Sequence, residues 1–295
     1  MSIDVAVVAY ESEHLVEGLV RSVKEHVPQA RVLFWANSDP EPLRAAVADA
    51  GPHVPADVLG DGANQGFGRS CNALAHSSDR EWIMFLNPDA VITGWDPRVL
   101  ECSPGTLVGA LVRLPDGSVQ QTYGADRTLS FEFRQRLLRR RPPLVVPRES
   151  MAVDFVSGAA ILVRREEFLR VGGFDPAYFM YYEDIALGRT WRERGGPVIV
   201  DPRWTVSHIG GGISRKRPLT ALIRGQESAE LYQSRTTGRR WPLRAIAVTE
   251  SLLKLTVALL RGRVGKVDRD TQAQFTRYLL TNHGPRTQRE VAGSG

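Results

Sequence analysis

The first 90 residues repeat one pattern: a short apolar run, a polar or glycine-rich turn, and then a segment whose apolar residues have helical spacing. Short apolar runs without alternation are typical of strands buried on both faces. Alternation of such strands with helices predicts an α/β fold with a doubly wound, mostly parallel central sheet. The predicted strands are 4–10, 31–35, 58–59 and 82–86, and the predicted helices are 15–26, 42–50 and 69–76.

The turns that follow these strands predict a binding site. Ligands of doubly wound sheets bind at the carboxyl ends of the strands. All four ends are polar or rich in glycine, and they carry residues 10–11, 37–39, 61–68 and 87–89.

After residue 96 the pattern changes. The turn Pro115-Asp116-Gly117 is typical of a hairpin between 107–113 and 118–122. The basic, proline-containing segment 131–148 lacks core periodicity, which predicts a mobile surface segment. Later elements are predicted as strands at 153–164 and 197–200 and helices at 166–171 and 182–194.

Asn87-Pro88-Asp89 follows the fourth strand. A carboxylate at a strand end can hold a divalent cation and leave positions for water and a diphosphate. The same tripeptide is also an ordinary turn, so both interpretations stay open here.

The segment 64–72 (NQGFGRSCN) begins the third helix. Its glycines permit close approach of a ligand, helix N-terminal amides suit phosphate, and Arg69 can pair with it. The segment is neither a dinucleotide fingerprint nor a P-loop. A simple helix cap is the alternative.

Two further groups carry candidate chemistry. Glu183 and Asp184 begin a helix, where one carboxylate can act as a base or both can simply favour the helix dipole. His208 precedes Gly210-Gly211-Gly212 and Ser214, so it is either a metal ligand beneath a flexible glycine lid or an ordinary loop histidine.

Together these motifs resemble the inverting, nucleotide-sugar-dependent glycosyltransferases of family 2, which have the GT-A fold, and especially the rhamnosyltransferase-like branch. The resemblance covers residues 3–235, and 154–195 is its most specific part. The residues that carry it are VVAYES (7–12), WANSD (35–39), NQGFGRSCN (64–72), FLNPDA (85–90), DFVSGAAILVRREEFLRVGGFDPAYFMYYEDIALGRTWRERG (154–195) and HIGGGIS (208–214).

The resemblance implies roles for individual positions. Asp184 would be the general base that deprotonates the acceptor hydroxyl, with Glu183 orienting the acceptor. Asp89 would bind Mg²⁺ or Mn²⁺ against the diphosphate, with His208 as a second protein ligand. The remaining donor-binding positions would be Ala9, Tyr10, Glu11 and Asn37 for the base and ribose, Asn64, Gly66 and Arg69 for the nucleotide pocket, Asn87 in the metal motif, and Gly158 beside the donor sugar.

The chain departs from the family pattern at two positions. Many relatives carry Asp where this chain has Asn37, and the metal motif begins with Asn87 instead of Asp. A neutral Asn87 lowers the local negative charge, so we expect metal to bind chiefly as a metal–nucleotide complex.

The resemblance implies transfer of a sugar from a dTDP or UDP donor to a hydroxyl, with dTDP-L-rhamnose as the first donor. The acceptor is open between a polyprenyl-linked saccharide and a soluble small molecule, for example in cell-wall or natural-product glycosylation. The alternative is a catalytically inactive sugar-nucleotide-binding protein. A nucleotidyltransferase requires a glycine-rich basic loop after the first strand, which YESEHL is not. A nucleic-acid partner is not expected, because no recognised motif accompanies the basic residues.

The C-terminal part differs in charge. Residues 1–210 hold 22 Lys/Arg and 27 Asp/Glu, whereas residues 211–295 hold 16 and 6. The apolar segment 245–260 contains Glu250 and Lys254 and is too short and charged to span a membrane. It predicts a helix that lies on an anionic bilayer, packs on the catalytic domain, or forms a homodimer.

The expected organisation is a GT-A domain over 1–235, with a nucleotide-binding half (1–100) and an acceptor and catalytic half (101–235), followed by a basic helical extension over 236–295. Two cysteines cannot form a disulfide framework, and the N-terminus enters a strand without signal-peptide features. These features predict a cytoplasmic protein, with peripheral contact at the inner face of the plasma membrane.

Overall fold

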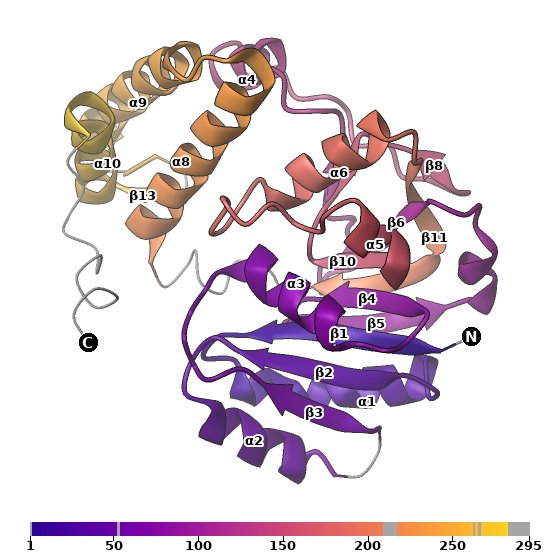
Figure 1. Ribbon diagram of the computed structural model, residues 1–295. Helices are drawn as coiled ribbons and strands as arrows, with labels where there is room; N and C mark the ends of the chain where they lie inside the picture. Colours follow the sequence, from indigo (N-terminus) through magenta and orange to yellow (C-terminus); the bar gives the residue numbers. More distant parts are fainter. Residues whose placement is uncertain (1, 52–53, 209–216, 262, 265–266, 283–295) are drawn as a thin grey trace. The chain divides into compact units, whose positions relative to one another are not determined.

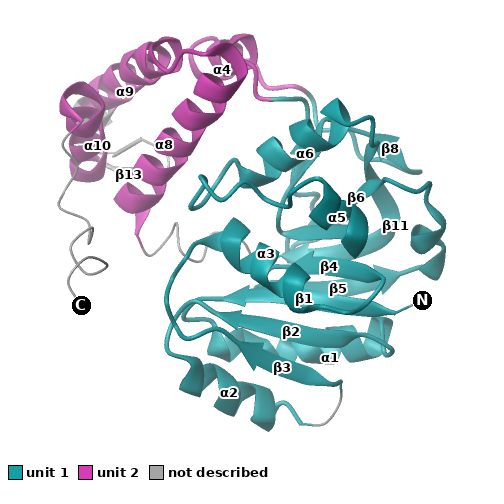
Figure 2. Ribbon diagram, viewed as in Figure 1, with its two compact units in different colours: residues 1–126, 143–210 teal, residues 127–142, 211–295 magenta. Residues whose placement is uncertain are grey.

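The structure is a computed structural model that describes residues 2–51, 54–208, 217–261, 263–264 and 267–282. The chain divides into two compact units. The first contains residues 1–126 and 143–210, and the second contains residues 127–142 and 211–295 (Figure 2). Each unit is described by itself.

The first unit is built on a nine-stranded sheet (Figure 1). The strand order is β3-β2-β1-β4-β10-β6-β11-β5, and β8 pairs with β11. The strands are β1 (Ile3–Ala9), β2 (Arg31–Ala36), β3 (Ala56–Leu59), β4 (Trp82–Leu86), β5 (Ala90–Trp95), β6 (Leu107–Arg113), β8 (Met151–Ala152), β10 (Ala160–Arg164) and β11 (Val198–His208).

The N-terminal half of the sheet is parallel, as predicted. β1 pairs in parallel with β2 and β4, and β2 pairs in parallel with β3. Beyond β4 the pairing is mixed: β10 is antiparallel to β4 and β6, and β11 is parallel to β6 but antiparallel to β5. The expected α/β fold is confirmed, and strands of mixed direction extend the sheet beyond β4.

Helices cover both faces of this sheet. Every residue of β1 is buried, and its side chains alternate between two apolar clusters, with Val5 and Val7 in one and Ala6 and Val8 in the other. The helices of this unit are η1 (Glu13–Leu15), α1 (Val16–His26), α2 (Pro40–Asp49), α3 (Phe67–Ser77), η2 (Pro97–Glu101), α5 (Arg165–Arg170) and α6 (Glu183–Glu193).

Several predicted elements differ from the structure. β11 continues to His208, well past residue 200. Residues 118–122 form only an isolated bridge, between Arg113 and Val119, around the Gly117 turn. The predicted strand 153–164 is β10 together with β9 (Phe155–Val156), which pairs with β7 (Tyr123–Gly124). Segment 131–148, which was predicted to be a mobile surface segment, begins inside helix α4 (Leu129–Arg136).

The second unit is mainly helical. It comprises α4 (Leu129–Arg136), α8 (Pro218–Thr237), α9 (Trp241–Arg261), α10 (Arg269–Thr281) and the short pair β12 (Arg263–Val264) and β13 (Val267–Asp268). The Thr128 side chain caps α4, and α4 contacts α9. Arg136 pairs with the buried Glu132 and donates to Gln226 on α8 (2.9 Å). These tertiary contacts, which local periodicity does not report, give segment 129–136 its helical structure.

The predicted boundary at residue 235 lies near the C-terminal end of α8. In the structure α8 groups with α9 and α10, and the inserted segment 127–142 joins them. The division into a catalytic domain and a C-terminal extension therefore stays a prediction about function.

Candidate active site

The carboxyl ends of β1 and β2 meet the N-terminus of α3. The Asn37 backbone N–H donates to Ala9 O (2.8 Å), and its side-chain Nδ2 donates to Gly66 O (3.2 Å). Asn37 Oδ1 accepts from Ser70 Oγ (2.9 Å), and Asn37 is buried. A carboxylate at this position could not donate to the Gly66 carbonyl. The amide therefore has a structural use here, and its contact with a donor base stays a prediction.

Gly66 allows the backbone of the loop after β3 to pass close to the backbone of Phe179. Its φ is +89°, and a Cβ there would lie 2.3 Å from Phe179 O. The Gly66 N–H donates to Asn64 Oδ1 (3.1 Å), and Arg69 Nε donates to Pro176 O (2.8 Å). All three predicted pocket residues thus hold the loop after β3 or the segment that leads into α6.

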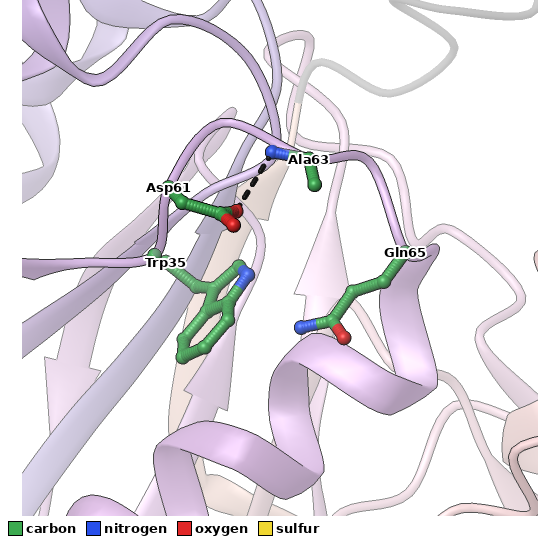
Figure 3. A pocket seen from close by; sticks show the side chains of 5 residues that line it. Trp35, Asp61, Ala63 and Gln65 are labelled. Carbon is green, nitrogen blue, oxygen red and sulfur yellow. Dashed lines mark hydrogen bonds between the residues drawn. The ribbon is translucent and has the colours of Figure 1, made fainter. Parts of the chain in front are cut away.

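A hollow of about 420 Å³ lies at the ends of β2 and β3 (Figure 3). It is lined by Trp35, Gly60, Asp61, Ala63 and Gln65. Asp61 Oδ1 accepts from the Ala63 N–H (3.0 Å), and the buried Trp35 Nε1 has no hydrogen-bond partner among the described residues. The volume falls in the range of small-molecule sites, and an indole offers an apolar plane to a ring.

Glu11 begins the turn after β1 in a left-handed backbone conformation. Its φ is +49°, and its N–H donates to Ser38 Oγ (3.1 Å). Tyr181 and Tyr182, directly before α6, have φ of +70° and +66°. Non-glycine residues in this region are uncommon and gather at functional sites. The strained turns flank two of the predicted site segments.

Glu183 and Asp184 are the first residues of α6, and they have different surroundings. Asp184 is partly exposed, and its Oδ2 accepts from the Gly158 N–H (3.1 Å) while its Oδ1 accepts from the Ile185 N–H (2.8 Å). Glu183 is buried, and its Oε2 has no hydrogen-bond partner in the described part of the chain.

These surroundings act differently on the pKa values of the two carboxyl groups. Burial, together with the neighbouring charge of Asp184, raises the pKa of Glu183 to about 8. Burial also raises the pKa of Asp184, but the amides of Gly158 and Ile185 oppose that shift because they stabilise the carboxylate. These shifts favour a shared proton on Glu183, because the amides stabilise the Asp184 carboxylate while Glu183 Oε2 has no partner in the described part of the chain.

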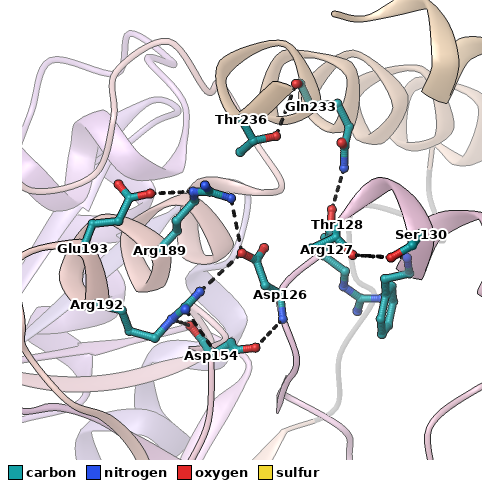
Figure 4. A network of polar contacts seen from close by, with 11 residues as sticks. Asp126, Arg127, Thr128, Ser130, Asp154, Arg189, Arg192, Glu193, Gln233 and Thr236 are labelled. Atoms are coloured by element: carbon teal, nitrogen blue, oxygen red, sulfur yellow. Dashed lines mark hydrogen bonds and ion pairs between the residues drawn. The ribbon is translucent and has the colours of Figure 1, made fainter. Parts of the chain in front are cut away.

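An ion network holds α6 in the first unit (Figure 4). Arg189 and Arg192 both contact Asp126 Oδ2 at 3.4 Å. Arg192 Nε also donates to Asp154 O (3.0 Å), and the Asp126 N–H donates to Asp154 Oδ2 (2.8 Å). The helix that carries the acid pair is thereby tied to the segments beside β7 and β9.

Asp89 and His208 come together across 119 residues of sequence. His208 Nε2 lies 3.0 Å from Asp89 Oδ1, and its Nδ1 lies 3.0 Å from Gln120 Oε1. Asn87 Nδ2 is 3.5 Å from the same Nε2. The predicted metal pair is therefore assembled by the end of β11 and the turn after β4.

The donor set fits a hard divalent cation. Ligands of an octahedral ion lie about 2.1 Å from it, so neighbouring ligands are about 3.0 Å apart. An imidazole that donates from Nδ1 to Gln120 presents Nε2 as a ligand. Among the described residues no group of three or more His, Cys, Asp or Glu could hold a metal. Two protein ligands leave coordination positions for a diphosphate and water.

Segment 157–159 connects the two pairs. Ala159 O accepts from the Asn87 N–H (3.0 Å), while the neighbouring Gly158 N–H donates to Asp184. A Cβ on Gly158 would lie 2.7 Å from the Phe67 ring, so glycine permits this close packing. The lid predicted at Gly210-Gly211-Gly212 and Ser214 lies outside the described residues.

The chain is similar to known sugar transferases. It is 28% identical over 275 residues to N-acetylglucosaminyl-diphospho-decaprenol L-rhamnosyltransferase of Mycobacterium tuberculosis, covering 80% of this chain and 87% of the relative. It is 29% identical over 142 residues to rhamnosyltransferase WbbL of Escherichia coli, covering 43% of this chain and 54% of that protein. No protein-family model matches the chain.

Solved structures share the fold. GalNAc-T7 with UDP, GalNAc and Mn²⁺ has a TM-score of 0.58 at 13% identity, covering 97% of this chain and 58% of that one. Mannosyltransferase PcManGT from Pyrobaculum calidifontis, with GDP-Man and Mn²⁺, has a TM-score of 0.53 at 15% identity, covering 94% and 84%. The relatives and the shared fold support a glycosyltransferase of the GT-A fold that is similar to the rhamnosyltransferases.

Sequence reasoning did not assign three residues of this glycosyltransferase's site. Gln120 carries no signal in the sequence, because it meets His208 only through the fold. Trp35 and Asp61 stand at strand ends among apolar and glycine residues. An aromatic residue and an acidic residue at the ends of strands could have been assigned to the site from the sequence.

Proposed function

We propose that this glycosyltransferase moves L-rhamnose from dTDP-L-rhamnose to a hydroxyl of a polyprenyl-diphosphate-linked saccharide, with inversion at the anomeric carbon. The observation that supports the reaction type is the Gly158–Ala159 bridge: the Gly158 N–H donates to Asp184, and Ala159 O accepts from the N–H of Asn87, two residues before Asp89. The named activity of the M. tuberculosis relative favours this donor sugar and a lipid-linked acceptor.

In this proposal Asp184 is the general base. Its carboxylate takes the proton of the acceptor hydroxyl while the acceptor oxygen bonds to the anomeric carbon and the bond to the diphosphate oxygen breaks. The two backbone amides fix the orientation of the carboxylate. A neutral Glu183 keeps a second charge away from the base, and its predicted role in orienting the acceptor belongs to this proposal.

The donor would lie along the ends of the first four strands. Asp89 and His208 would hold Mg²⁺ or Mn²⁺, which when bound supplies charge neutralisation for the leaving diphosphate. The hollow beside Trp35 and Asp61 would take the thymine base. The other predicted donor contacts are Ala9, Tyr10, Glu11, Asn37, Asn64, Gly66, Arg69, Asn87 and Gly158.

A donor screen followed by a transfer assay tests the proposal. Thermal shifts would be measured with dTDP-, UDP- and GDP-sugars, with and without Mn²⁺, and transfer would then be assayed on a lipid-linked and a soluble acceptor. We expect a metal-dependent rise in Tm with the dTDP donor and transfer to the lipid-linked acceptor. Donor binding without transfer to either acceptor would favour an inactive binder instead.

The cellular location of the protein stays a prediction. Within the described residues, no helix has the length and apolar character needed to cross a membrane. The expected cytoplasmic location and the homodimer remain proposals. The donor screen and the transfer assay test neither of them.

A further inference from the structure

Among the described side chains of α9, the exposed face is mostly apolar and carries no charge. The side chains exposed on this helix recur at intervals of three or four residues, so they share one face. We call this face the apolar stripe. It consists of Trp241, Ala245, Thr249, Leu252, Leu253, Thr256 and Leu260, none of which is charged.

The large side chains of the stripe are well exposed. Trp241 is 67% exposed, Leu253 57% and Leu260 82%. Single exposed apolar residues are ordinary on protein surfaces, but a contiguous apolar row marks an interaction surface.

Two polar residues of α9, Arg244 and Ser251, face the other helices of the unit. Arg244 pairs with Glu230 of α8 (3.2 Å), and the buried Ser251 accepts from Gln272 of α10 (2.7 Å) and contacts Thr276 (2.9 Å). A helix that only needed to pack on its own unit would turn such residues to solvent. Instead α9 keeps an ion pair and buried hydrogen bonds on its covered side and exposes large apolar side chains.

Basic residues adjoin the stripe. Arg239 and Arg240 directly precede Trp241, are exposed, and make no ion pair among the described residues. Residues 211–295 hold 16 Lys/Arg against 6 Asp/Glu. Arginine beside tryptophan at the end of an apolar helix face suits the boundary between lipid headgroups and acyl chains.

A second copy of the chain fits this surface less well than a lipid surface does. Residues 261–269 at the other end of α9 contain four basic residues and one acidic residue. In a parallel pair of stripes Arg239 and Arg240 would face their own copies, and in an antiparallel pair they would face this second basic end. Both directions bring like charges together, whereas anionic headgroups complement both ends.

We infer that the apolar stripe of α9 binds the surface of an anionic bilayer, lying in the interface rather than crossing it. The inference depends on the second unit alone and does not require the proposed reaction. It gives the predicted peripheral membrane contact a defined set of residues.

Vesicle binding by the full chain tests this inference. Flotation would be measured with phosphatidylcholine vesicles and with vesicles of equal parts phosphatidylcholine and phosphatidylglycerol. We expect binding to the anionic vesicles, weak binding to the neutral ones, and release at about 1 M NaCl, where the Debye length falls to about 3 Å. Equal binding to both vesicle types, or binding to neither, would overturn the inference.

Matched variants locate the surface. Leu253→Glu should weaken vesicle binding at least about tenfold, because burial of a leucine is lost and a like charge is added. Val145→Glu, at 55% exposure in the first unit, is the control and should bind as the unmodified chain does. Arg239→Gln with Arg240→Gln should cost about 30-fold on anionic vesicles.

Two further measurements distinguish loss of membrane binding from unfolding and from loss of self-association. Leu260→Glu, the most exposed position of the stripe, repeats the test if Leu253→Glu lowers the Tm. Sedimentation velocity without vesicles reports self-association. A dimer that Leu253→Glu dissociates, with vesicle binding unchanged, would assign the stripe to a second copy and overturn the inference. Donor binding in solution is measured separately and reports on the proposed function alone.

Discussion

The two pairs of side chains at the site are built by different means. Glu183 and Asp184 are neighbours in sequence, and the first turn of α6 and two backbone amides set their geometry. Asp89 and His208 are 119 residues apart, and their 3.0 Å contact depends on the pairing of β5 with β11. The two acids differ in environment although they are adjacent, whereas Asp89 and His208 meet only because β5 and β11 are paired in the sheet.

This difference bears on how each pair should respond to change. A local pair retains its position when a neighbour is altered, so its chemistry depends on which atom carries the proton. A pair joined by tertiary contacts depends on the residues that hold it together. Four predictions test this contrast, beginning with the largest effect.

Asp184→Asn should lower kcat by about 10²–10⁴-fold, because an amide cannot accept the acceptor's proton. Donor affinity should be largely kept, since the amide retains the shape and the contact with Gly158. Single-turnover kinetics together with donor titration would measure both. A variant with near-normal turnover would mean that Asp184 is not the base.

Gln120→Leu should weaken metal binding in the presence of donor nucleotide by about 10–100-fold, because the partner that orients His208 is lost. Calorimetric titration of Mn²⁺ into the protein with saturating dTDP would measure the change. Gln121→Leu, at the exposed neighbouring position, serves as the control. Unchanged metal affinity in Gln120→Leu would show that Asp89 and His208 bind the metal without the contact from Gln120.

Asn87→Asp should let the free protein bind Mn²⁺ about tenfold more tightly, because a third ligand, a carboxylate oxygen that carries negative charge, joins the pair. Calorimetry without nucleotide gives this value. Tight binding of metal by the unmodified protein alone would contradict our expectation that metal enters with the nucleotide.

Glu183→Gln should flatten the pH dependence of stability. The raised pKa means that folded protein holds a proton which the unfolded chain releases above its ordinary carboxyl pKa, so stability falls as pH rises toward about 8. The variant should remove a slope of up to about 1.4 kcal/mol per pH unit. Urea unfolding at pH 6, 7 and 8 would show it, and parallel curves for both proteins would place the proton elsewhere.

Much of the first unit is readable from periodicity. Trp82–Leu86 was predicted with its observed bounds, and α1 and α3 within a residue or two, because strands and helices repeat their apolar positions locally. The polar strand ends then pointed to the site. The length of β11 was missed, because Asp201 and Arg203 break the apolar run and are stabilised by pairing with each other.

The sequence by itself determined the alternation of strands and helices, the polar edge of the parallel strands and the adjacent acids, since each is written in neighbouring residues. The tertiary structure alone decided that Asn37 donates to Gly66, that Gln120 supports His208, and that 127–142 joins the C-terminal helices. It also decided which apolar face of α9 is covered and which is exposed. These outcomes depend on contacts between distant residues, and the spacing of residues along a chain carries no record of such contacts.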